Sequence, residues 1–336
     1  MNILVEGTRG KSGIVNMLVD TLEARGEPAI GKITGLEPAV FYKGEKIPII
    51  RKNRKFLIDV ENKKILKQYR HVKFKVFENQ ALSPYTMKAV HLVFKPDIIA
   101  IPNIRYEHQD TLGETIEEQA ASFAMNFEGA KVVITTEQKE PVLKIFRKYC
   151  TKYKVELIEI KKEESFPGSS SVHLVNGVLK YVFQIELSEE EFRNLFKNLS
   201  TRISVYYNYE KGIHYFKGSK INDIESTKNL YNFLKQKIEK PFCFICYFRK
   251  DRPERTKAFI PFLKEAVKDE RIKKIFIVGH HLGNIPKDAK ISILKEKYPE
   301  LVFDYCRLNG YILFTAVNGV TPFMQGIELN LDGGKP

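Results

Sequence analysis

A glycine-rich segment near the start of the chain contains the residue types that bind phosphate. Its sequence is Gly7-Thr8-Arg9-Gly10-Lys11-Ser12, and it lies between a short apolar run and a stretch with helical spacing. Glycines let backbone N–H groups curve around a phosphate, the lysine reaches the outer phosphates, and the serine hydroxyl binds a metal ion. The segment matches the end of a Walker A loop, although Val5 stands where the general pattern has its first glycine. We expect a nucleotide phosphate site here, with an accidental glycine turn as the alternative.

The segments around this glycine loop predict a strand, a loop and a helix in that order. Residues 2–6 are largely apolar, and apolar side chains recur at helical spacing over residues 13–25. Helical stretches at 112–127 and 140–153 then alternate with further apolar segments. These segments, interpreted as strands, are 72–77, 98–101 and 132–135. Such alternation indicates an α/β fold with a mainly parallel sheet.

The alternation loosens between about residues 160 and 200, where Pro167-Gly168-Ser169 is a loop signal. A domain boundary is therefore expected nearby. From Arg202 onward, apolar and helical segments alternate again, and the expected strands are 203–208, 213–216, 242–247, 274–279 and 312–316. We expect two domains, residues 1–195 and a smaller Rossmann-like α/β domain over residues 196–336.

Several blocks of the first half resemble the Mur ligase superfamily, and most of all its poly-γ-glutamate synthetase branch, the CapB or PgsB type. The glycine loop resembles that branch's G-x-R-G-K-S, and Gly31-Lys32-Ile33-Thr34-Gly35 resembles its G-K-T-T-G. Residues 77–84 resemble the block whose glutamate binds magnesium, here Glu78. Residues 103–113 resemble the block whose histidine is a metal ligand, here His108.

Three features of the second half resemble the C-terminal domain of the same superfamily. Arg202 matches the arginine that reaches the terminal phosphate, and Asn222-Asp223 matches the pair near the ribose. The block Arg249-Lys250-Asp251-Arg252-Pro253-Glu254-Arg255-Thr256 resembles the branch's R-x-D-R-x-x-R-T. The resemblance implies a P-loop, Mur-ligase-like central domain with ATP bound over residues 1–195 and a Mur-ligase C-terminal-type domain over residues 196–336.

ATP and Mg²⁺ are the cofactors that the resemblance implies. Ser12, Glu78 and a neutral His108 would hold the magnesium ion, and arginines would stabilise the transferring phosphoryl group. The implied catalytic residues are Lys11, Glu78, His108 and Arg202. The implied nucleotide-binding residues are Gly7, Thr8, Arg9, Gly10, Lys11, Ser12, Asn222, Asp223, Asp251, Arg252 and Arg255. Without the resemblance, Glu78 and His108 would be interpreted as ordinary surface side chains, and the arginines as a cluster exposed to solvent.

Composition and charge indicate a soluble globular protein with an anionic partner. Hydrophobic residues make up 43% and charged residues 29%, and no apolar run reaches the roughly 18 to 20 residues that span a bilayer. We expect a cytoplasmic protein that reaches a membrane only through a partner. The formal charge of +14 calls for an anionic partner, but the lysines are scattered and form no stripe with aromatic residues, so nucleic acid is not expected. Cys243 and Cys246 lie in an apolar run and are expected to be buried packing.

The resemblance implies an ATP-dependent, ADP-forming amide ligase that makes poly-γ-glutamate or another γ-linked peptide. A substrate carboxylate attacks the γ-phosphate to give an acyl phosphate, and an amine then displaces phosphate. The substrate is an amino acid or an acidic peptide, and a membrane-bound partner subunit and a homo-oligomer stay open. Because the chain begins almost at the glycine loop, we expect no separate domain for a UDP-linked substrate. The alternatives are a P-loop nucleic-acid-binding protein and a non-catalytic Mur-ligase-like partner subunit.

Overall fold

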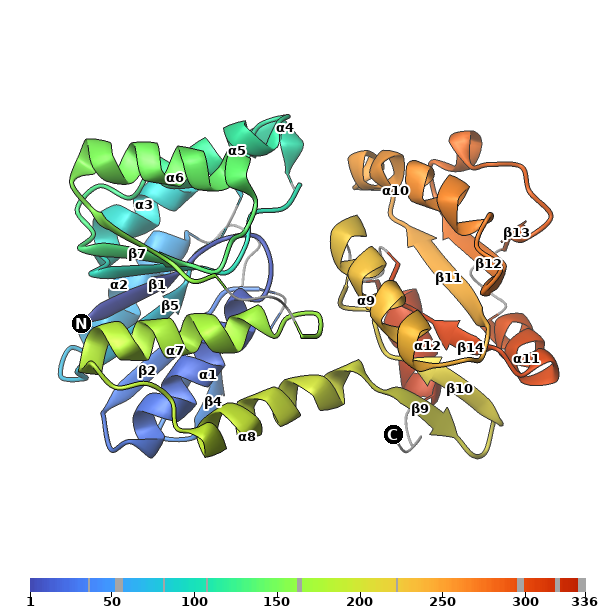
Figure 1. Cartoon of the computed structure of the whole chain (residues 1–336), viewed down its shortest axis with the longest axis horizontal. Helices are drawn as coiled ribbons and strands as arrows, with labels where there is room; N and C mark the ends of the chain where they lie inside the picture. Colours follow the sequence, from blue (N-terminus) through green and yellow to red (C-terminus); the bar gives the residue numbers. More distant parts are fainter. Residues whose placement is uncertain are drawn as a thin grey trace. The chain divides into compact units, whose positions relative to one another are not determined.

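The computed structural model describes most of the chain in two compact units. The described residues are 1–35, 37–51, 57–80, 82–106, 108–161, 165–221, 223–294, 299–317 and 321–331. The first unit is Met1–Lys197 and the second is Asn198–Pro336. In Figure 1 the first runs in colour from blue to yellow-green and the second from yellow to red.

The first unit is built on an eight-stranded sheet with the order β4-β3-β2-β5-β1-β6-β7-β8. Neighbouring strands are parallel from β2 to β8, whereas β3 pairs antiparallel with both β2 and β4. Every residue of β2, β6 and β7 is buried, as expected for parallel strands with helices on both faces. The strands are β1 Asn2–Val5, β2 Ala29–Ile33, β3 Ala39–Tyr42, β4 Glu45–Pro48, β5 Phe74–Glu78, β6 Ile98–Ile101, β7 Val132–Thr135 and β8 Glu156–Glu159.

Helices cover both faces of this sheet. The helices α1 and α7 pack together on one face, and α3, α5 and α6 lie on the other with α2 beside α3 (Figure 1). Two apolar clusters fill the space between the second group and the sheet. The helices are α1 Lys11–Ala24, α2 Ile58–Gln68, α3 Pro84–Phe94, α4 Gln109–Leu112, α5 Ile116–Ala124, α6 Glu140–Tyr153, α7 Ser170–Phe183 and α8 Glu189–Ser200.

One predicted helix is broken in the structure. The sequence predicts a single helix over 112–127, but α4 ends at Leu112 and α5 begins at Ile116. Gly113 between them has a φ of 123°, which an L-residue rarely adopts. Thr115 then starts α5 with a capping box, because its side chain accepts from the backbone of Glu118 and the Glu118 side chain accepts in return. Local turn chemistry thus outweighs the apolar periodicity.

Residues 160–200 are more regular than their sequence indicates. The loop signal at 167–169 is a turn, but α7 and α8 follow it. The structure describes all of α8, and none of its residues is buried. The apolar residues of α8, Phe192, Leu195, Phe196 and Leu199, recur at helical spacing, a signal that the prediction did not use.

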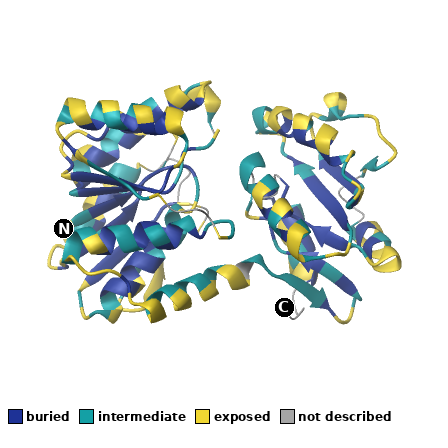
Figure 2. Cartoon of the chain, in the orientation of Figure 1, coloured by how far each residue is buried: buried dark blue, intermediate teal, exposed yellow. Residues whose placement is uncertain are grey.

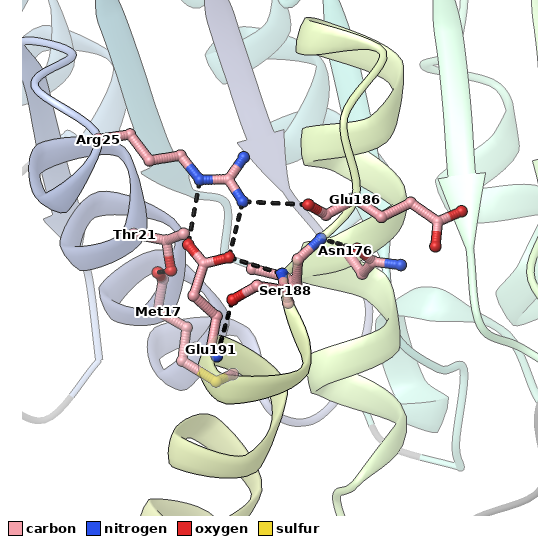
Figure 3. A network of polar contacts seen from close by, with 8 residues as sticks. Met17, Thr21, Arg25, Asn176, Glu186, Ser188 and Glu191 are labelled. Carbon is pink, nitrogen blue, oxygen red and sulfur yellow. Dashed lines mark hydrogen bonds and ion pairs between the residues drawn. The ribbon is translucent and has the colours of Figure 1, made fainter.

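Polar contacts fix the first turn of α8 against the end of α1 (Figure 3). The Arg25 guanidinium donates from Nε and Nη2 to the two carboxylate oxygens of Glu191, at 3.1 and 2.9 Å. Glu191 in turn accepts from the backbone N–H of Ser188 at 2.7 Å, and its own N–H donates to the Ser188 hydroxyl at 3.2 Å. Asn176 of α7 accepts from the N–H of Leu187 at 2.7 Å. The helix α8, which leads to the second unit, is therefore anchored on α1, the helix that follows the glycine loop.

The second unit has a six-stranded sheet with the order β13-β12-β11-β14-β10-β9, and only β9 is antiparallel to its neighbour. Its strands are β9 Val205–Asn208, β10 Ile213–Phe216, β11 Phe242–Phe248, β12 Ile272–Gly279, β13 Ile291–Ile293 and β14 Ile312–Phe314. Its helices are η1 Thr201–Ile203, α9 Ile224–Lys237, α10 Pro253–Ala266, η2 Leu282–Asn284, α11 Pro299–Asn309 and α12 Pro322–Leu331. The predicted fold class, α/β with mainly parallel sheets, is confirmed in both units.

Two apolar clusters stabilise the second unit, one under α9 and α10 and the other under α11 and α12. Figure 2 shows the buried strands of each sheet in dark blue between helices whose outer faces are exposed. Cys243 and Cys246 lie in β11 and are fully buried, and burial raises the pKa of both thiols above its ordinary value. The pair is therefore core packing, as predicted. Among the helices that the structure describes, none combines the length and the apolar character needed to cross a bilayer.

Candidate active site

The glycine loop lies between the end of β1 and the start of α1, as the sequence predicts. Gly7 and Gly10 have φ values of 95° and 89°. A Cβ atom at Gly7 would lie 2.6 Å from the carbonyl oxygen of Asn103, so the loop passes too close to a neighbouring backbone for any side chain there. Gly10 is the N-cap residue of α1. The loop therefore depends on glycine for both its curvature and its closeness to the end of β6.

Asn103, just beyond β6, holds the loop in shape. Its carbonyl oxygen accepts from the N–H of Thr8 at 2.9 Å, and its side-chain oxygen accepts from the N–H of Arg9 at 3.1 Å. Its side-chain amide donates back to the Arg9 carbonyl at 3.2 Å. Two loop amides are thus used within the protein. The amides offered to a phosphate come from the first turn of α1, where N–H groups have no intrahelical acceptor and the helix dipole favours an anion.

Lys11, the first residue of α1, folds its side chain back over this loop. Its Nζ donates to the carbonyl oxygens of Gly7 at 2.7 Å and Thr8 at 3.1 Å. The ammonium group therefore lies beside the loop, where phosphate oxygens could replace the carbonyl oxygens. A cation and a helix N-terminus at one place suit the phosphates of a nucleotide.

Ser12 and Glu78 bring a hydroxyl and a carboxylate together beside the loop. The Ser12 hydroxyl donates to Oε2 of Glu78 at 2.7 Å, although the two residues are 66 positions apart. Their meeting follows from topology, since β1 and β5 are parallel neighbours and Val5 is in register with Glu78. Adjacent ligands of an octahedral Mg²⁺ lie about 3 Å apart, given Mg–O distances of about 2.1 Å. The pair therefore fits the metal that the sequence predicts.

His108 directly precedes α4, with a φ of 49° and its carbonyl accepting from the N–H of Leu112 at 2.8 Å. Its participation in a metal site with Ser12 and Glu78 stays a prediction. Across the described ranges, no group of three or more His, Cys, Asp or Glu side chains is arranged to hold a metal ion. A magnesium ion here would take its other ligands from water and phosphate, as Mg²⁺ usually does.

A buried polar cluster lies behind the loop and was missed by the sequence analysis. Oε1 of Glu6 accepts from the Asn79 side chain at 2.5 Å and lies 2.6 Å from Nε2 of His91 in α3. All three side chains are at most 5% exposed. The cluster connects the residue before the loop with the residue after Glu78. The signal in the sequence was the position of Glu6 and Asn79, each directly after a strand at the same edge of the sheet.

The second unit carries the remaining predicted residues. The backbone of Arg202 lies in η1, directly after α8. Asn222 lies outside the described residues. Asp223 is the N-cap of α9, where Oδ1 accepts from the N–H of Ser226 at 2.8 Å, and it is 7% exposed. Part of the Asp223 carboxylate therefore serves the helix, and its contact with a ribose stays a prediction.

The R-x-D-R-x-x-R-T block forms the connection from β11 to α10. Arg249 grips both carboxylate oxygens of Asp251, at 2.8 and 2.6 Å, and this contact holds the pKa of Asp251 below its ordinary value. Arg252 lies 4.0 Å from Asp251 and 4.0 Å from Glu254. Arg255 is in the first turn of α10. The arginines are thus gathered at one end of the second sheet, and their convergence with the glycine loop on a single nucleotide stays a prediction.

Comparison with known proteins shows what this arrangement resembles. Residues 204–311, within the second unit, match the family described as the poly-gamma-glutamate synthase CapB C-terminal domain. Along its length, the chain is 24% identical to PGA synthase CapB of Bacillus subtilis (strain 168), over 95% of this chain and 87% of that protein. The resemblance to the CapB branch is therefore confirmed beyond the C-terminal domain.

Solved structures show the same fold over both units. The chain resembles E. coli FolC, solved with DHPP and ADP, with a TM-score of 0.70 at 11% identity, covering 98% of this chain and 88% of that one. It also resembles a bifunctional folylpolyglutamate synthase/dihydrofolate synthase of Yersinia pestis, solved with AMPPNP and a Mn ion, with a TM-score of 0.68 at 14% identity and coverage of 98% and 88%. These are Mur-ligase-like folds. The chain therefore has the Mur-ligase-like fold that its sequence resemblance implies.

Proposed function

We propose that this CapB-type chain is an ATP-dependent, ADP-forming ligase that forms γ-linked amide bonds to glutamate. Both groups of relatives support this activity, because one is named for poly-γ-glutamate synthesis and the other for folylpolyglutamate synthesis. The observation that carries the proposal is the contact of Ser12 with Glu78 beside the loop that Lys11 covers. Hydroxyl, carboxylate and ammonium groups at one edge of the sheet are suited to a metal-bound triphosphate.

The phosphates of ATP would bind at the first turn of α1. Lys11 would exchange the carbonyl oxygens of Gly7 and Thr8 for phosphate oxygens, so its charge is held in place before the nucleotide arrives. Ser12, Glu78 and His108 would hold Mg²⁺, which supplies charge neutralisation at the β- and γ-phosphates. Such preorganisation lowers the reorganisation that the transition state requires.

The reaction would proceed in two displacements. A carboxylate oxygen of the acceptor attacks the γ-phosphorus, the bond to the β,γ-bridging oxygen breaks, and ADP leaves. The amino nitrogen of the incoming amino acid then attacks the acyl carbon, loses a proton, and expels phosphate. Exclusion of water protects the acyl phosphate between these steps. Arg202, Arg252 and Arg255 of the second unit would stabilise the charge on the transferred group, with Asn222, Asp223 and Asp251 near the nucleotide.

The substrate is an amino acid or a peptide, and we propose an acidic γ-linked peptide as the acceptor. The formal charge of +14 supports a polyanionic chain as the partner. A membrane-bound partner subunit and self-association are further predictions. Copurification from membranes and the mass of the purified protein in solution would test them.

The test is ADP release measured over a panel of amino acids and short γ-glutamyl peptides. Lys11→Ala is expected to lower substrate-stimulated release by about 10²-fold, because it removes a cation aimed at the transferring group. Lys88→Ala is the matched control, since Lys88 is an exposed lysine of the same unit whose Nζ lies 3.7 Å from Glu128. ATP binding without any substrate-stimulated ADP release would instead indicate a non-catalytic partner subunit.

A further inference from the structure

A buried ionic network lies beneath the end of β2, next to the proposed metal site. The Lys32 side chain is fully buried, and its Nζ lies 2.8 Å from Oε1 of Glu61 and 2.5 Å from the side-chain oxygen of Asn62. Arg51 grips the same Glu61 carboxylate with Nε and Nη2, each at 2.9 Å. Burying charged side chains costs desolvation free energy, which pairing offsets only in part. A buried network of this kind therefore suggests a functional role.

Two cations of this network, Lys32 and Arg51, contact the same carboxylate, that of Glu61. Burial lowers the pKa of Lys32, and the contact with Glu61 and the negative charge of Glu78 act in the opposite direction. Glu78 is thus a second anion that acts on Lys32, which connects the network electrostatically to the proposed metal ligand.

Thr34 provides the direct link between Arg51 and Glu78. Nη1 of Arg51 donates to the Thr34 carbonyl oxygen at 3.2 Å, and the Thr34 N–H donates to Oε2 of Glu78 at 3.3 Å. The same carboxylate oxygen accepts from Ser12. Thr34 is 1% exposed, and its hydroxyl makes no hydrogen bond within the described part of the chain. Its placement therefore depends on these two backbone contacts.

We propose that Arg51 is a positioning residue that orients the Glu78 carboxylate toward the metal, acting through the backbone of Thr34. This inference rests on the proposed function, because it assigns a role to Arg51 at that same metal site. The two hydrogen bonds from Nε and Nη2 to Glu61 fix the orientation of the Arg51 guanidinium. Its Nη1 then holds the carbonyl of Thr34, directly after β2. Glu78 is then held by Thr34 on one side and Ser12 on the other before any metal binds.

Removal of the guanidinium should weaken metal binding more than it weakens the fold. In Arg51→Met the Thr34 carbonyl loses this donor, while Lys32 still pairs with Glu61. Removing a group that orients a metal ligand typically lowers metal affinity by 10- to 100-fold. Because Arg51 acts on Glu78 only indirectly, through the backbone of Thr34, we expect a change at the lower end, about tenfold.

The experiment measures Mn²⁺ binding to the full chain by electron paramagnetic resonance, with AMPPNP present and no turnover required. Arg147→Met is the matched control, because Arg147 grips Glu159 in the same forked way, at 2.6 and 2.7 Å, between α6 and β8. Arg51→Lys is a second variant, which keeps the positive charge but loses the paired hydrogen bonds to the Glu61 carboxylate. Melting temperatures of all three variants report any general loss of stability.

Weaker Mn²⁺ binding by about tenfold in Arg51→Met, with an intermediate effect in Arg51→Lys and wild-type binding in Arg147→Met, supports the inference. Equal Mn²⁺ affinity in Arg51→Met and the wild type overturns it, as does an equal loss in the Arg51→Met and Arg147→Met variants. No Mn²⁺ binding in the wild type would reject the metal site itself, and with it the proposed function. The two failures are therefore distinguishable.

Discussion

At the scale of single residues, the candidate active site depends on close contacts between atoms. Gly7 can carry no Cβ because Asn103 is too close, and the Ser12 hydroxyl touches the carboxylate that would share its metal ion. The Thr34 N–H touches that same carboxylate. Such contacts leave little room for substitution, since a displacement of about 1 Å is enough to impair a catalytic site.

Gly7→Ala is predicted to destabilise the chain more than Gly26→Ala. Both positions have positive φ, so both variants carry about 1–2 kcal/mol of left-handed strain. A Cβ at Gly26 would meet nothing within 4 Å, whereas one at Gly7 would lie 2.6 Å from the Asn103 carbonyl. Overpacking adds about 1–3 kcal/mol at Gly7. Urea unfolding of both variants checks the difference, and equal midpoints would contradict it.

At the scale of elements, some parts of the fold followed from local pattern and others did not. The helix predicted at 140–153 and the strand predicted at 213–216 match α6 and β10, because their apolar spacing is regular. The helix predicted at 112–127 is interrupted at Gly113. The helix α8 was missed although its apolar residues recur at helical spacing, because the loop signal at 167–169 was given more weight than this periodicity.

The anchoring of α8 leads to a prediction about local rather than global stability. Arg25 and Glu191 are 21% and 32% exposed, so their ion pair contributes under about 1 kcal/mol to the free energy of unfolding. Arg25→Met should nevertheless speed hydrogen exchange in the first turn of α8, because the contact with α1 is lost. Exchange measured by mass spectrometry tests this. Unchanged protection of residues 189–192 would show that the aromatic contacts of Phe192 and Phe196 with His173 suffice.

At the scale of the whole molecule, the chain has two sheets, and each unit has apolar clusters of its own. The first unit holds the glycine loop and the proposed metal ligands. The second holds residues 204–311, which match the CapB C-terminal domain, and the arginine block. If the reaction uses both sets of residues, as we propose, catalysis requires groups from both units, and closure around the substrates would exclude water.

Substitution of Arg202 tests whether catalysis needs residues of both units. If its guanidinium stabilises the transferred phosphoryl group, Arg202→Ala should lower the turnover number by about 10²-fold and change ATP half-saturation little. Arg307→Ala is the control in the same unit, because Arg307 is 52% exposed and its guanidinium pairs with Asp304 on the same helix. Steady-state kinetics of ADP release provide both constants. A wild-type turnover number in Arg202→Ala would argue against an active site shared by the two units.

The sequence by itself determined the parts that are local in the chain. The glycine loop, the strand before it and the helix after it lie within the first 25 residues, so their order and spacing were enough. Family resemblance added the expectation that Glu78 binds a metal ion. Tertiary structure decided what surrounds Glu78, because the order β2-β5-β1-β6 brings Thr34, Glu78 and Ser12 to one edge of the sheet. Strand order depends on how apolar faces pack over long separations, and no local pattern encodes it.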